Sequence, residues 1–150
     1  MRKVLNPRVL AGALMVMLIL TFTPASALTS TTYENDVITW TNAKRADKKL
    51  VAVKSQSCVD GYAEKQASWL ANNRKLEHQN LRTILKACKL TSVSENIAYG
   101  YSSGKSVVDA WMKSPGHKAN LLNSKMRLIG VGAVQDKNGV WWVSQVFGKK

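Results

Sequence analysis

The residues that could carry chemistry gather in one stretch of the chain, residues 94–123. This stretch contains Glu95 and His117, and His117 is one of only two histidines in the sequence, the other being His78. Two imidazoles, one carboxylate and a water would satisfy a four-coordinate Zn²⁺ of the open, catalytic kind. The spacing of the two histidines matches no metal motif, so the residues alone leave two ordinary polar histidines as the alternative. A Pro-Gly pair just before His117 predicts that this side chain lies on a tight turn.

A nucleophilic serine is the second chemistry to consider. The run from Gly100 to Gly104 matches the G-x-S-x-G elbow of hydrolases, with Ser102 as the nucleophile. That elbow needs an acid and then a histidine on separate later loops. The only later histidine, His117, follows at the far end of the next predicted helix. A Ser/Gly connector is therefore the preferred interpretation of this run.

General acid and base catalysis by two carboxylates is the third chemistry. Glu95 is one candidate, and Asp109 comes closest to being the second. The helical periodicity places Asp109 far around its helix from Ser114, so we expect Asp109 to face away from any site. The sequence offers no good pair of acids.

The N-terminus has the pattern of a secretory signal. Residues 1–27 begin with basic side chains, continue with an apolar run too short to cross a membrane, and end in an A-x-A cleavage site at Ala27. An uncleaved anchor is the alternative. Cleavage after Ala27 predicts a secreted or extracellular protein. The remaining residues are the length of one ordinary domain and nothing suggests a second, and we expect a monomer. The two cysteines that follow, Cys58 and Cys88, predict one disulfide, because an even count is typical of exported domains.

The composition is strongly basic, with a formal net charge of +13 for the whole chain. Such a charge favours anionic surfaces, such as cell-wall polymers or lipid head groups. The basic residues are scattered and no nucleic-acid motif accompanies them, so a solvated basic surface is the preferred interpretation and no specific nucleic acid is expected.

Hydrophobic periodicity predicts how the chain begins. Residues 28–34 read as a flexible leader, and a helix from about Asn35 turns Val37 and Thr41 inward and Arg45 to water. Further elements are expected at residues 60–73 (helix), 81–85 (turn), 97–99 (strand) and 105–112 (helix). The sequence thus predicts short packed elements around the candidate residues.

The C-terminal part predicts a β-hairpin, residues 128–135 and 140–148, joined by a turn that contains Asn138-Gly139. Both faces of its second strand are apolar, with Trp141 and Trp142 on opposite faces. A sheet that is apolar on both faces must be covered on both, which predicts a three-layer α/β/α sandwich around a small antiparallel sheet.

The motifs of the chain resemble the CAP superfamily, also called SCP-domain proteins, which includes cysteine-rich secretory and pathogenesis-related proteins. The runs that carry the resemblance are Glu95-Asn-Ile-Ala, Trp111-Met-Lys-Ser-Pro-Gly-His117-Lys-Ala-Asn-Leu-Leu-Asn, Ile129-Gly-Val-Gly and Trp142-Val-Ser-Gln-Val-Phe-Gly148. The match is closest to the short bacterial secreted branch and makes residues 35–150 one CAP domain. It implies an α/β/α sandwich with a central cleft lined by two histidines and two acids.

By position, the resemblance implies that His78, Glu95, Ser114 and His117 line this cleft. His78 and His117 match the histidines that bind Zn²⁺ or another divalent ion in some members, and Glu95 matches the first acid. Ser114 stands where the second acid is expected, which weakens any acid and base role. The function we expect is a secreted, non-catalytic module that binds a lipid, a sterol or a cell-wall component at the cell surface or in the medium. The alternative is a weak metal-assisted hydrolase or protease that uses His78, His117 and Glu95.

Overall fold

The computed structural model describes residues 28–150, so the predicted signal and its cleavage site lie outside the described residues. The described chain forms α1 (Ser30–Ala46), β1 (Lys54–Ser55), α2 (Ser57–Asn73), α3 (Leu81–Ala87), β2 (Ser92–Tyr99), α4 (Gly104–Lys113), α5 (Pro115–Leu121), β3 (Leu128–Gln135) and β4 (Trp141–Lys149). Within residues 28–150 no helix combines the length and the apolar character that crossing a membrane requires.

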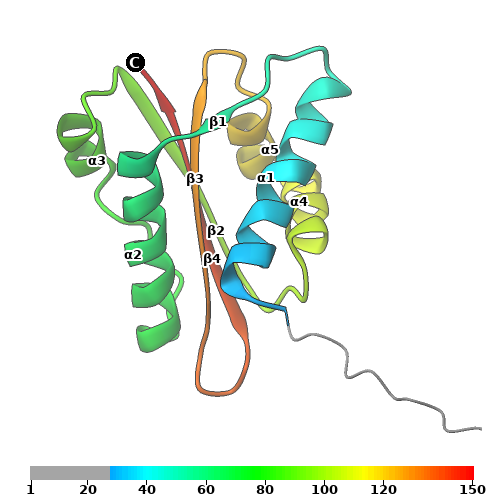
Figure 1. Cartoon of the computed structure of the whole chain (residues 1–150), viewed down its shortest axis with the longest axis vertical. Helices are drawn as coiled ribbons and strands as arrows, with labels where there is room; N and C mark the ends of the chain where they lie inside the picture. Colours follow the sequence, from blue (N-terminus) through cyan, green and yellow to red (C-terminus); the bar gives the residue numbers. More distant parts are fainter. Residues whose placement is uncertain (1–27) are drawn as a thin grey trace, which may run out of the picture.

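These elements form three layers, as predicted (Figure 1). The sheet has the strand order β1-β3-β4-β2, with α2 and α3 on one face and α1, α4 and α5 on the other (Figure 1). All of β4 except its last residue is buried, which confirms that both faces of this strand are covered. Trp141, Val143 and Phe147 belong to the core beneath α1 and α4, whereas Trp142 and Val146 pack on the α2 side.

The long strands of the sheet pair antiparallel, as predicted, and one short strand adds a parallel pair. The β2–β4 and β3–β4 pairs are antiparallel, but β1 pairs with β3 in parallel through Lys54 opposite Leu128 and Ser55 opposite Ile129. A strand of two exposed residues carries no alternation of polar and apolar side chains, so no periodicity could reveal it.

The leader predicted for residues 28–34 is wrong beyond its first two residues, because α1 begins at Ser30. The Thr29 side chain accepts a hydrogen bond from the Thr32 N–H, which is the N-cap that starts the helix. Tyr33 is fully buried and its hydroxyl donates to the Tyr101 carbonyl at 3.0 Å. Burial raises the pKa of this hydroxyl, so it stays a hydrogen-bond donor.

The prediction that Arg45 faces water is also wrong, because its side chain is fully buried. Its guanidinium donates to four main-chain carbonyls at 2.8 to 3.2 Å: those of Val51, Leu121, Asn123 and Met126. Burial lowers the pKa of Arg45, with the nearby charge of Arg127 as a smaller cause. The contacts join α1 to the segment that follows α5.

Glycines let α2 lie close against the sheet. A Cβ on Gly130 would collide with the main chain of Asp60, and one on Gly132 with that of Ala63 and Glu64. Close packing of α2 therefore explains these two glycines. A disulfide between Cys58 and Cys88 joins α2 to the end of α3, which confirms the predicted pairing.

Three elements around the candidate site differ from their predicted form. The strand predicted at residues 97–99 extends from Ser92, so Glu95 lies inside β2. Residues 81–85 belong to the helix α3, because Asn80 caps it by accepting from the Arg82 N–H. Pro115 ends α4 but also occupies the first turn of α5, so His117 lies on a helix and not on a tight turn.

Candidate functional site

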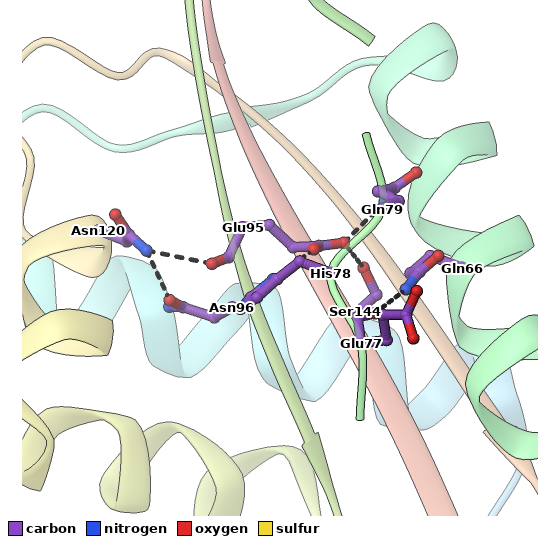
Figure 2. Close-up of polar contacts among 8 residues, drawn as sticks. All are labelled: Gln66, Glu77, His78, Gln79, Glu95, Asn96, Asn120 and Ser144. Atoms are coloured by element: carbon purple, nitrogen blue, oxygen red, sulfur yellow. Dashed lines mark hydrogen bonds and ion pairs between the residues drawn. The ribbon is translucent and has the colours of Figure 1, made fainter. Parts of the chain in front are cut away.

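The Glu95 carboxylate is the centre of the polar site. Its side chain has no exposed surface, and three donors reach it (Figure 2). His78 bonds Oε2 through Nδ1 at 2.7 Å, while the Gln79 amide and the Ser144 hydroxyl donate to Oε1 at 2.7 and 3.0 Å. A buried carboxylate needs such partners, because desolvation without them is costly. Both oxygens of Glu95 are thereby occupied by protein groups.

The segment between α2 and α3 brings two of these donors to Glu95. Arg74 ends α2 in the left-handed conformation, with φ 49°, which turns the chain back toward the sheet. The Gln66 amide holds the turn by donating to the Glu77 carbonyl at 2.5 Å. His78 remains 57% exposed in its side chain although its Nδ1 meets the buried carboxylate. His78 therefore lies at the surface and only its inner nitrogen is committed.

A second polar cluster lies on the opposite face of β2. The Asn96 amide donates to the His117 carbonyl at 3.2 Å and to Gln145 Oε1 at 3.1 Å. The Asn120 amide donates to Asn96 Oδ1 at 2.9 Å and to the Glu95 carbonyl at 3.1 Å (Figure 2). Buried amides with these partners dock α5 against β2 and so fix the position of His117.

This second cluster was not predicted from the sequence. Asn96 and Gln145 are both fully buried, and they occupy paired positions of β2 and β4. An amide beside the apolar run Ile97-Ala98 and a second amide inside the largely apolar β4 are the signal that could have revealed the cluster, because a buried amide requires a partner.

A pocket of about 280 Å³ opens beside His117 and Ser114. Its other lining residues are mostly apolar: Leu76, Ile97, Ala98, Tyr99, Tyr101, Ala110 and Trp111. Ser114 caps α5 without using its hydroxyl, so this group faces no competing cap contact. The pocket thus combines a wide apolar wall with an imidazole and a hydroxyl.

Burial lowers the pKa of His117, and the coulombic interaction with the second imidazole, that of His78, lowers it further. Both causes favour the neutral imidazole, because each penalises the charged form. The Trp111 ring lies 6.3 Å from the His117 ring, and its Nε1 is buried with no hydrogen-bond partner among residues 28–150. At neutral pH the wall of the pocket is therefore uncharged at His117.

Three of the four predicted cleft residues line one of two pockets, and Glu95 lines neither. His117 and Ser114 line the apolar pocket, whereas His78 lines a second, more polar one of about 270 Å³ with Trp69. Asp109 faces away from both, since it pairs with Lys44 at 2.8 Å and Lys105 at 2.6 Å. Ser102 lines neither pocket, and the connector around it serves the capping of α4 by Ser103 and Ser106.

The donor set falls short of a catalytic zinc site, which takes three protein ligands and a water. Among residues 28–150 no three His, Cys, Asp or Glu side chains are grouped so that they could hold a metal ion. Glu95 is bound by His78 Nδ1 itself, and Ser114 replaces the second acid. The described residues therefore show no catalytic site with three protein ligands, and we assign no chemical step to a metal ion.

The comparison with known proteins decides the family. The profile of the cysteine-rich secretory protein family, CAP, matches residues 39–147. The chain belongs to the CAP family. The resemblance inferred from the motifs around Glu95 and His117 is thereby confirmed.

A relative of this CAP domain occurs in a bacterium. The uncharacterized protein YkwD of Bacillus subtilis is 31% identical over 124 residues, which are 78% of this chain and 48% of YkwD. The chain therefore spans about half the length of that relative.

Solved structures show the same fold at lower identity. An extracellular SCP-domain protein from Bacillus anthracis superposes with a TM-score of 0.72 at 23% identity, covering 81% of this chain and 41% of that one. An outer surface protein from Borrelia burgdorferi has a TM-score of 0.70 at 22% identity, covering 76% of this chain and 90% of that one.

Proposed function

We propose that this CAP domain is a secreted, non-catalytic binding module that takes up the apolar part of a ligand in the pocket beside His117. The composition of the wall supports this, because ligand pockets are usually apolar with a few placed polar groups. Leu76, Tyr99 and Tyr101 are large, exposed apolar side chains at this pocket. A lipid, a sterol or an apolar part of a cell-wall component would each supply a matching surface.

The proposal rests on the burial and hydrogen bonding of the Glu95 carboxylate. A general base must reach the proton that it abstracts. The carboxylate has no exposed surface, is bonded by three protein donors and does not line the apolar pocket. The hydrolase alternative needs Glu95 to face a substrate, which would require these contacts to break.

Secretion is part of the proposal and is supported by the predicted signal before residue 28. The Cys58–Cys88 disulfide agrees with an oxidising compartment. The name of the Bacillus anthracis protein describes that protein as extracellular, and we extend this location to the present chain.

The test uses 1-anilinonaphthalene-8-sulfonate, an anionic probe with apolar rings, and a variant that fills the pocket. Ala110 lines the pocket on α4, so Ala110→Phe should lower the affinity of the probe about tenfold or more. Ala87→Phe makes the same change at an exposed position of α3 and serves as the matched control. Equal affinity in all three proteins would overturn the binding site. Turnover of peptide or ester substrates that disappears in Glu95→Gln would overturn the non-catalytic assignment.

A further inference from the structure

The strand β2 is an edge of the sheet, and the register shows which of its main-chain groups point away from it. The Gly100 N–H, directly after β2, donates to the Trp141 carbonyl at 2.9 Å, in line with the pairing of Tyr99 and Trp142. Main-chain groups alternate between the two sides along an antiparallel strand. The groups of Ala98 therefore face β4, and those of Ile97 and Tyr99 face outward.

A side chain confirms this alternation independently. The Glu95 carbonyl, two residues before Ile97, accepts from the Asn120 amide at 3.1 Å on the open side of β2. Asn120 thus takes the place that an adjoining strand would take at Glu95. No other hydrogen bond within residues 28–150 covers the outward groups of Ile97 and Tyr99. The uncovered edge begins where the contact of Asn120 ends.

The apolar pocket lies along this uncovered stretch. Ile97, Ala98 and Tyr99 all contribute to its lining. Leu76 approaches from the segment after α2, and Trp111 belongs to α4, on the other face of the sheet (Figure 1). A strand added at an edge directs alternate side chains to the two faces. The pocket therefore offers apolar surface to side chains on both sides of such a strand.

The charge around the pocket favours an acidic partner. None of the lining residues carries a carboxylate. Lys113 precedes Ser114, Lys118 follows His117, and both lysines are exposed. The two acids that adjoin lining residues, Glu77 and Asp109, are already paired with lysines. A second copy of the chain would bring the same lysines toward each other, and a lipid has no main-chain groups to pair with the edge.

We propose that the edge of β2 from Ile97 to Tyr99 binds an extended, acidic peptide segment as an added β-strand, with apolar side chains of the peptide in the pocket. This inference rests on the proposed function, because the peptide occupies the same pocket. Main-chain hydrogen bonds along the edge provide affinity, and the pocket selects alternate side chains.

The probe is the fluorescein-labelled peptide Glu-Val-Leu-Val-Glu, compared with Lys-Val-Leu-Val-Lys and with an N-methylated Glu-Val-Leu-Val-Glu that lacks main-chain donors. Binding of the first peptide should be weakened about tenfold or more by either change. Equal binding of the N-methylated peptide overturns the added strand, and equal binding of the lysine peptide overturns the acidic preference.

A pair of protein variants tests the edge itself. Tyr99→Pro removes an outward N–H, a change that edge strands tolerate, whereas Tyr99→Val removes the same ring and keeps the N–H. The proline variant should bind the acidic peptide about three to ten times more weakly than the valine variant. Equal affinities would contradict the proposal, provided that both variants unfold at similar temperatures.

Amide exchange measured by NMR distinguishes a bound peptide from a second copy of the chain at the edge of β2. In the free protein the Ile97 and Tyr99 amides should exchange faster than that of Ala98, and the peptide should protect them. Protection in the free protein together with dimers in sedimentation would assign the edge to a second copy and overturn the peptide. Binding of 1-anilinonaphthalene-8-sulfonate without any peptide binding up to about 1 mM would overturn the peptide and leave the proposed function standing. If neither the dye nor the peptide binds, both proposals fail.

Discussion

The contacts of Glu95 allow its contribution to stability to be estimated from two substitutions. Glu95→Ala removes the acceptor of three donors. The Ser144 hydroxyl is fully buried and would be left unpaired, which costs about 1–3 kcal/mol, while His78 and Gln79 would each lose a bond worth about 0.5–1.5 kcal/mol and regain water. We expect a loss of about 3 kcal/mol in the free energy of unfolding.

Glu95→Gln should be much milder. The amide oxygen keeps the contacts with Gln79 and Ser144, and the amide NH₂ can donate to Nδ1 of a neutral His78. The remaining cost is the loss of charge from these hydrogen bonds, about 1 kcal/mol. Glu95→Gln should therefore be more stable than Glu95→Ala because it keeps a hydrogen-bond acceptor for Gln79 and Ser144, although both variants lose the charge.

Urea unfolding at neutral pH, followed by tryptophan fluorescence, measures both differences. Glu64→Ala is the control, because Glu64 is exposed on α2 and should change stability by less than about 0.5 kcal/mol. If Glu95→Gln destabilised the protein as much as Glu95→Ala, or if neither differed from the control, the reasoning that Glu95 anchors the segment before α3 would be refuted.

Three further results are expected. Replacing both Cys58 and Cys88 by alanine should cost about 3–4 kcal/mol for a sequence separation of 30, and two free thiols in the secreted protein would contradict the pairing. The lowered pKa of His117 means that the folded state disfavours protonation, so stability is complete above the unfolded pKa of about 6.5 and declines as the pH falls through the folded value. His117→Gln should weaken the dependence of the free energy of unfolding on pH between roughly pH 7 and pH 5, measured with chelator present. An unchanged pH dependence would be evidence against this assignment. Added Zn²⁺ should raise the melting temperature by no more than about 2 °C, since two histidines make a weak site; a larger rise that disappears in His78→Ala would mean that a third ligand exists.

The parts of the fold that follow from local periodicity were predictable. The hairpin of β3 and β4 and the helix α2 carry their cause within a few residues of sequence. The two apolar faces of β4 were sufficient to require helices on both sides, which gave the layers without any knowledge of the partners.

The parts that failed depend on distant residues. Arg45 has the position of a solvated charge on an amphipathic helix, and its burial is explained only by carbonyls between residues 51 and 126. The motif identified Glu95 and His117, but not that two of the three donors to Glu95 come from the segment before α3 or that Asn96 holds α5. Side-chain partners far apart in sequence leave no periodic signal.

The cage of carbonyls around Arg45 resembles a coordination shell. In many loops, converging main-chain oxygens are held together by a calcium ion, and order is lost when the ion leaves. Here the cation is the guanidinium of Arg45, which is part of α1, so it is always present and no chelator can remove it. Leu121 is the last residue of α5, the residues up to Met126 follow it, and α5 carries His117. The Arg45 guanidinium on α1 therefore helps to hold α5 and His117 in position beside the pocket. This position should not depend on the calcium concentration of the surrounding medium.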